Sequence, residues 1–263
     1  MARSMGGCVS NSFQRATTYR VNLFLEFVGS MIIAIAAVYL WHAAFQTNDK
    51  VAGFEIGQMI IYIIYARAIA RLLTIDPSEM ASEQIETGNI VFYFIRPMHP
   101  LIAMNSFAFG SIGFQLVFFS LPSAWLLHLF FEVPAPQLSQ YGAFFVFLIL
   151  GLGIHLSICS LVTCINLYSK NVRGISLFRS IIVGFLSGAI IPTDLFPIII
   201  QDCLKYLPFR YICEIPCKVM ATFLISQEIH NCFILAIFWN AILWPLASFL
   251  WRFGTKQYEA SGG

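Results

Sequence analysis

The sequence has few charged residues. Of its 263 residues, 11% are charged and 59% are hydrophobic, whereas soluble domains average about 25% charged residues. This chain lacks the polar side chains that would cover a water-facing surface, so an ordinary soluble domain is excluded. The formal net charge of +2 is also too small for the basic surface by which proteins bind nucleic acid. We therefore expect an integral membrane protein whose solvent is the lipid bilayer, with no nucleic-acid partner.

The sequence also lacks the short motifs of known catalytic and metal sites. It contains no GxxxxGK[ST], HExxH or GxSxG pattern, so the chain by itself has no recognisable means of hydrolysing ATP, a peptide or an ester. Its seven cysteines form no CxxC pair, which argues against a zinc or redox site. We expect no catalytic residue, no metal site and no directly bound cofactor. A disulfide among Cys203, Cys213 and Cys217 is left open.

Long apolar segments dominate what is present. A bilayer core about 30 Å thick needs about 20 apolar residues per helix. Six segments meet this requirement: 22–45, 54–75, 102–131, 141–168, 175–191 and 229–252. Pro122 lies inside the third segment, which predicts a kink or an interfacial extension at its outer end. We predict an all-α integral membrane protein with six transmembrane helices in a single domain, residues 1–263.

Lysine and arginine residues are distributed unevenly between the two sides of this arrangement. Cytoplasmic loops carry the excess of these residues, and the larger group lies near both termini and beside the segments 76–100 and 169–174. Both termini are therefore predicted to be cytoplasmic. The segment 192–228 is then external. Its four prolines interrupt a half-apolar stretch, which is typical of a re-entrant or interfacial helical pair (Pro192, Pro197, Pro208 and Pro216).

The segment 76–100 is the longest polar interruption on the cytoplasmic side. Asp76 and Pro77 are typical of a helix start, and Gly88 is typical of a helix end. Within this short helix, three acids form one face and two apolar residues offer contacts (Glu79, Glu83 and Glu86; Met80 and Ile85). Arg96 and Pro97 then prevent further helix before the next apolar segment begins.

Three ionisable residues lie inside apolar segments, where charge is costly. We expect Glu26 to pair with Arg67 or Arg71, or each side chain to extend to the headgroups. His155 lies in the fourth segment and is expected to pack there or to relay protons. An intramembrane enzyme that uses His155 with Glu26 is a further alternative, although no paired catalytic spacing supports it.

Two groups of motifs are similar to those of a known family. Ile85-Glu86-Thr87-Gly88-Asn89-Ile90, followed by Phe94-Ile95-Arg96-Pro97, is similar to the signature I-(D/E)-x-G-x-I…L-x-R-P. Ser187-Gly188, Ile191-Pro192, Phe196-Pro197, Leu207-Pro208-Phe209 and Pro216 are similar to the same family's helix-five exit and external re-entrant element. The chain resembles the ABC-2 type transporter permeases, in particular the six-helix bacterial exporter branch without a fused ATPase domain. The resemblance covers nearly the whole chain.

The resemblance implies a permease subunit of an ATP-driven exporter in the bacterial inner membrane. A second permease, identical or similar, would form the substrate path with it, and a separate ABC ATPase subunit would use ATP and Mg. The helix in 76–100 would be the coupling helix that contacts this ATPase, with the residues Glu79, Met80, Glu83, Ile85, Glu86, Gly88, Arg96 and Pro97. A non-transporting immunity or ligand-sequestering protein on the same scaffold is the alternative.

The resemblance also assigns a role to the external segment. It would close the outer end of the path through Pro192, Phe196, Pro197, Leu207, Pro208 and Phe209. Phe196, Leu207 and Phe209 are the candidates for a hydrophobic gate, and the alternative is a lid that only anchors the sixth helix. The substrate is not identified, although the few fixed charges favour an amphipathic or hydrophobic cargo.

Overall fold

The protein is all-helical, as the apolar segments predict. The computed structural model describes residues 20–46, 50–95, 98–168, 172–222, 224 and 226–257. In these ranges we find no β-sheet, and the only β contact is one isolated bridge between Val51 and Phe54. The fold class predicted from composition and segment length is therefore confirmed.

The helices follow the chain in a simple order. The long ones are α2 (Arg20–Ala44), α3 (Ile56–Leu73), α6 (Pro100–Gln115) with its continuation α7 (Leu121–Phe130), α8 (Leu138–Asn166), α9 (Val172–Leu186) and α12 (Ser226–Gln257). The short ones are α4 (Pro77–Glu86), α5 (Val91–Phe94), α10 (Ile198–Tyr206) and α11 (Glu214–Met220). A π-helical turn (Leu116–Ser120) joins α6 to α7, and 3-10 turns lie at Thr193–Leu195 and Phe209–Tyr211. The π-helical turn directly precedes Pro122, where the sequence predicted a kink.

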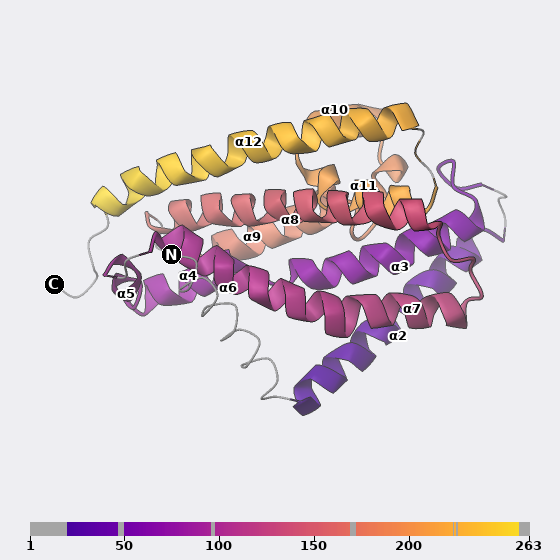
Figure 1. Cartoon of the computed structure of the whole chain (residues 1–263), viewed down its shortest axis with the longest axis horizontal. Coiled ribbons are helices and arrows are strands. Elements are labelled where there is room, and N and C mark those ends of the chain that lie inside the picture. The colour runs from indigo at the N-terminus through magenta and orange to yellow at the C-terminus, as the bar shows by residue number, and fades with distance from the viewer. Residues whose placement is uncertain are drawn as a thin grey trace.

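The long helices form an elongated bundle with different short helices toward its two ends. Figure 1 shows α8, α12 and the continuous α6–α7 rod running lengthwise, with α4 and α5 at one end and α10 and α11 toward the other. Helix α2 crosses the bundle obliquely. The short helices of the two segments singled out in the sequence, 76–100 and 192–228, therefore lie toward opposite ends of the molecule.

Five helices of the described ranges are long and apolar enough to cross a membrane: Phe24–Ala44, Ile56–Glu86, Pro100–Phe130, Leu138–Asn166 and Gln227–Thr255. The predicted fifth segment, 175–191, is helical only to Leu186. Helix α9 has 15 residues, which span about 22 Å at 1.5 Å per residue and fall short of the bilayer core. The chain is a multi-pass membrane protein, and the sixth spanning helix is not confirmed.

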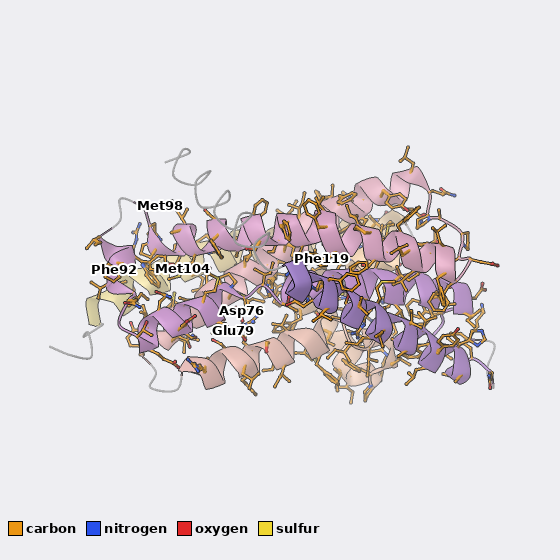
Figure 2. The ribbon with its side chains drawn as sticks, turned by 90° about the horizontal axis from the view of Figure 1, so that it is seen from below. Asp76, Glu79, Phe92, Met98, Met104 and Phe119 are labelled. Atoms are coloured by element: carbon orange, nitrogen blue, oxygen red, sulfur yellow. The ribbon has the colours of Figure 1, made fainter. Side chains whose placement is uncertain are left out.

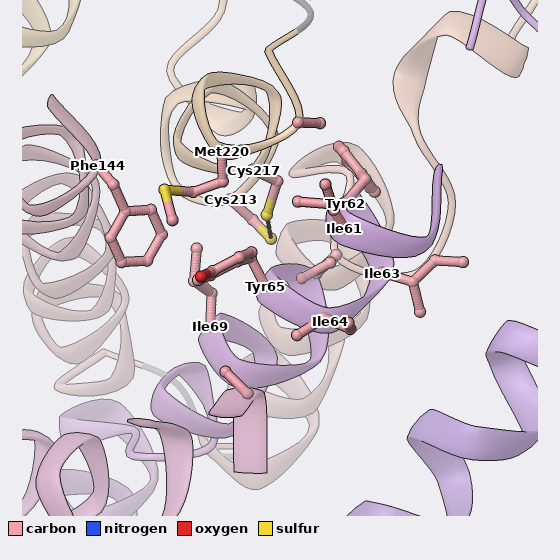
Figure 3. Close-up of a cluster of buried hydrophobic side chains, with 14 of the residues drawn as sticks. Ile61, Tyr62, Ile63, Ile64, Tyr65, Ile69, Phe144, Cys213, Cys217 and Met220 are labelled. Atoms are coloured by element: carbon pink, nitrogen blue, oxygen red, sulfur yellow. Dashed lines mark hydrogen bonds between the residues drawn. The ribbon is translucent and has the colours of Figure 1, made fainter. Parts of the chain in front are cut away.

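Helix α11 lies inside the bundle. All of its residues are buried, and it packs against α3 and α8. Figure 3 shows this contact, in which Tyr62 and Tyr65 of α3 face Cys213, Cys217 and Met220. The Sγ atoms of Cys213 and Cys217 are 3.8 Å apart. Both residues are free thiols in this structure, as is the exposed Cys203. The disulfide left open from the sequence is therefore not formed among these three cysteines in this structure.

Glycines permit the closest approaches between these elements. A Cβ atom on Gly151 would lie 2.6 Å from the carbonyl oxygen of Tyr211, so α8 touches the backbone of the external segment. Gly188 ends the turn after α9 with a φ of +78°, and a Cβ atom there would lie 2.7 Å from the hydroxyl oxygen of Tyr62. That hydroxyl donates a hydrogen bond of 2.7 Å to the Gly188 carbonyl. These contacts join the segment 192–228 to α8 and the turn that precedes it to α3.

Substitution of Gly188 tests this turn. Gly188→Ala introduces a side chain at positive φ and against Tyr62, so we expect a loss of about 1–3 kcal/mol in the free energy of unfolding. Gly184→Ala is the matched control, because its Cβ would meet only the Ile190 side chain at 3.7 Å. Thermal unfolding of the purified protein in detergent measures both. Equal melting temperatures for the two variants would contradict the role given to Gly188.

Candidate functional site

Helix α4 begins and ends where the sequence predicts. The Asp76 carboxylate caps the helix by accepting hydrogen bonds from the backbone N–H and the hydroxyl of Ser78, at 2.8 and 2.7 Å. Pro77 occupies the first turn, where its missing N–H is not needed. The helix ends at Glu86, and Gly88 follows with a φ of +72°, a conformation that glycine adopts without strain.

The inner face of α4 is held to the bundle by a small polar cluster. Ser78, Ala81 and Ser82 are buried. The Nδ2 amide of Asn166, at the end of α8, donates to the hydroxyls of Ser82 and Ser176 at 2.9 and 3.1 Å, and these hydroxyls lie 3.0 Å apart. Helix α4 is therefore fixed to both α8 and α9 and is not a freely solvated loop.

A buried ion pair makes the second link between α4 and α9. The Arg179 Nη2 atom of α9 donates to the Oδ2 atom of Asp76, and the two side chains are only 5% and 3% exposed. Two buried charges need each other, because removing either one leaves the other without compensation in a region of low dielectric. The residue that caps α4 is thus the same residue that neutralises Arg179.

A cavity of about 390 Å³ opens beside this ion pair. It lies between α3, α9 and the start of α4. Its polar lining consists of Arg67, Thr74, Asp76, Glu79, His155, Arg179 and Ser180. Figure 2 shows Asp76 and Glu79 close together at the start of α4. The site therefore combines a short helix at the end of the bundle with a cavity that reaches toward its interior.

The outer face of α4 carries the predicted acids. Glu79, Glu83 and Glu86 are exposed, and Glu86 pairs with Arg173 of α9 at 2.8 Å. The two predicted apolar contacts are only half-buried, and Ile85 packs against an internal cluster that includes Trp251. Of the other predicted contact residues, Gly88 is half-buried, and Arg96 and Pro97 lie outside the described residues.

Exposed apolar residues lie in α5 and directly after it. Val91, Phe92 and Ile95 are 40%, 58% and 74% exposed, and Figure 2 places Phe92 at the end of the bundle. No contact role was predicted for these three residues from the sequence. The run of apolar and aromatic residues from Val91 to Ile95 does not show which side chains are exposed. Their exposure depends on what α4 and α6 cover.

The chain returns to the bundle through His99. Its ring centroid lies 6.0 Å from that of Trp251 in α12. Partial burial, with a smaller contribution from the nearby Arg252, lowers the pKa of His99 and so favours its neutral form. The ring of His99 therefore places the end of the segment 76–100 against α12.

A second buried charge cluster holds the external segment. Lys218 of α11 contacts Glu214 at 2.6 Å and Asp194 at 2.7 Å, while Arg210 approaches Glu214 at 3.4 Å. The Thr193 hydroxyl also donates to Glu214. No partner was predicted for Arg210 or Lys218 from the sequence. Their acidic partners lie four to 24 residues away along the chain, and folding brings them together.

The predicted gate residues contact different neighbours. Phe196 stacks on Phe185 of α9 with ring centroids 5.1 Å apart, whereas Phe209 packs against the cluster around Tyr211. Leu207 is exposed. Of the three predicted prolines, Pro192 and Pro208 are buried and Pro197 is exposed. A further link runs to α12, where the Trp239 indole donates to the Tyr206 carbonyl at 3.0 Å.

The predicted intramembrane ion pair forms between Glu26 and Arg71. The Arg71 guanidinium also lies 5.6 Å from the ring centroid of Phe119, which Figure 2 labels beside α2. Arg67 instead lines the cavity.

His155 lies beside the end of α3. It faces the Ile75 carbonyl at 3.3 Å and the Cys159 thiol at 3.7 Å, whereas Glu26 pairs with Arg71. Across the described ranges, no group of three or more His, Cys, Asp or Glu residues is arranged to hold a metal ion.

A comparison with protein families agrees with the resemblance seen in the motifs. A family model described as ABC-2 family transporter protein matches residues 31–262. This range contains α3 to α12 and more than half of α2, and so includes both charge clusters and the cavity. A search of curated proteins finds no match.

The ion pair at the start of α4 can be tested by substitution. Asp76→Asn keeps an oxygen that caps the helix but leaves Arg179 buried without a counterion, so we expect a loss of about 3–5 kcal/mol in the free energy of unfolding. Glu86→Gln is the control. It breaks a pair in which the Arg173 side chain is 75% exposed, and such pairs contribute less than about 1 kcal/mol. Thermal unfolding in detergent compares them, and similar losses would contradict the assignment.

Proposed function

The chain belongs to the ABC-2 family of transporter proteins, and we propose that it is the permease subunit of an ATP-driven exporter. Its sequence has no phosphate-binding loop, so energy comes from a separate ABC ATPase subunit that binds ATP and Mg. The family description favours transport over the immunity or ligand-sequestering alternative. The proposed location is the bacterial inner membrane, with both termini in the cytoplasm.

The observation that carries this proposal is the two-sided character of α4. Its inner face is bonded to α8 and α9 through Ser82 and Asp76, while its outer face presents exposed acids. A rigid helix of this kind can pass a displacement from a bound partner to two long helices at once. We assign α4 as the coupling helix.

The proposed ATPase contact extends from α4 to α5. Glu79 and Glu83 would meet a basic rim on the ATPase, because opposite charges steer association and fix orientation. The apolar anchors would be Phe92 and Ile95, which are exposed. Met80 and Ile85, assigned this role from the sequence, are half-buried within the subunit, so they support α4 from within and contribute less contact area to a partner.

At the other end, the external segment acts as a lid over the outer mouth of the path. Its link to α12, through Tyr206 with Trp239, and the link of the preceding turn to α3, through Gly188 with Tyr62, support an anchored lid. Phe196 is the best placed gate residue, because it stacks on α9. A movement of α9 would therefore displace Phe196 together with the turn that precedes it.

A second permease subunit, identical or similar, would pack against the least buried helices. Only 11% of the spanning window of α2 and 17% of that of α12 is buried. Each helix exposes large apolar side chains along its length, such as Leu40 and Phe249. Lipid covers whatever part of these faces the second subunit leaves open.

Co-purification tests the proposed ATPase contact. From native membranes, we expect the chain to co-purify with an equal amount of an ABC ATPase. Glu79→Lys with Glu83→Lys places like charges against the proposed basic rim, which costs several kcal/mol, so ATPase recovery and ATP-driven transport should fall at least about tenfold.

Glu132→Lys is the charge-matched control, since Glu132 is exposed in the loop between α7 and α8. It should retain the ATPase. Isolation of the native chain without any ATPase would overturn the proposed function, whereas normal ATPase recovery in the double variant would overturn only the assignment of α4.

A further inference from the structure

The cavity beside α4 contains unused hydrogen-bond donors on a buried arginine. Arg179 is 6% exposed, and its Nη2 atom is bonded to Asp76. Its Nε and Nη1 atoms are buried and have no hydrogen-bond partner. Buried polar groups in native proteins are nearly always bonded, and a guanidinium offers several donors in a planar fork that matches an oxyanion. Two unused donors beside a cavity therefore point to an acceptor from outside the chain.

A second arginine lines the same cavity. Arg67 of α3 is half-buried, and within the described ranges we find no acid paired with it. Its neighbour one turn away, Arg71, is neutralised by Glu26. Helix α3 therefore carries one arginine with an acidic partner and one for which we find none in the described ranges. An arginine in a spanning helix faces an energetic cost unless it meets an anion or water. Arg67 and Arg179 together supply the positive side of an anion-binding site.

The remaining walls of the cavity are apolar. Val183, Gly184, Ala189 and Ile190 line it along α9 and the turn that follows, and Leu73 lines it from α3. Ile190 is 54% exposed, so this wall continues to the outer surface of the chain. A ligand with only a charged group would leave these side chains uncovered. A ligand with an attached alkyl chain would cover them and gain about 25 cal/mol per Å² of apolar surface buried.

We propose that this cavity binds an amphipathic anion, whose phosphate or carboxylate contacts Arg67 and Arg179 and whose apolar chain lies along α9. The acids that also line the cavity do not oppose this assignment. Asp76 is already bonded to Arg179, and Glu79 is exposed to solvent, where its charge is screened. The interpretation of this ligand as the exported cargo rests on the proposed function; its binding does not.

The site also touches the start of the coupling helix. The ligand anion and Asp76 share one guanidinium, and Asp76 caps α4. An occupied cavity would therefore change the interaction that fixes the start of α4. In this way the contact between Arg179 and Asp76 would pass the presence of the ligand to the proposed ATPase partner.

A direct binding measurement tests the site without any ATPase. We would reconstitute the purified full-length chain in phosphatidylcholine nanodiscs and measure retention of radiolabelled dodecyl phosphate by scintillation proximity, subtracting the signal of empty nanodiscs. We expect saturable binding with one ligand per chain and no such binding of dodecanol. Arg67→Gln should weaken binding about tenfold or more, because a charge-assisted hydrogen bond is lost.

Two further variants separate the site from the fold. Arg179→Lys keeps a cation beside Asp76 but removes the planar guanidinium with its Nε and Nη1 donors, and should also weaken binding. Arg252→Gln removes an exposed arginine of α12 and should bind normally. Absence of saturable binding, or equal binding by wild type and Arg67→Gln, would overturn the proposal. Competition by inorganic phosphate as strong as that by unlabelled dodecyl phosphate would also overturn it, because the apolar wall would then contribute nothing.

Discussion

The buried ion pair between Asp76 and Arg179 is the interaction on which this end of the molecule depends. Neither charge is tolerable alone in an apolar bundle, so the two helices that carry them must meet at this point. Since Asp76 also caps α4, one carboxylate sets both the start of the short helix and its attachment to α9. The cavity, the polar cluster around Asn166 and the exposed acidic face of α4 all take their positions from this attachment.

The opposite end of the bundle uses the same principle. There Lys218 lies between Glu214 and Asp194, and this cluster holds a segment that prolines keep from forming one long helix. Helix α3 contributes to both ends. Its Tyr62 hydroxyl bonds the turn at Gly188, and its Arg67 lines the cavity near α4. A rotation or shift of α3 would therefore change contacts at both ends of the permease.

Much of the fold could be predicted because local chemistry decides it. The apolar segments predict helices, and the Asp76-Pro77 start and the Gly88 end predict α4 almost to the residue. The length of α9 could not be predicted in this way, since its sequence remains apolar beyond Leu186. The helix ends there because Gly188 adopts a positive φ and its carbonyl is bonded to Tyr62, a partner 126 residues distant.

The candidate site divides along the same line. The sequence alone predicted an all-α membrane protein, its family resemblance, the acidic helix and the pairing of Glu26 with one of two arginines. These features could be predicted because composition, periodicity and capping are local properties. Tertiary structure decided that Arg71 takes Glu26 and that Arg67 lines the cavity. It also paired Asp76 with Arg179 across 103 residues. Such choices depend on which helices lie side by side, and in a bundle of similar apolar helices only the packed arrangement specifies the neighbours.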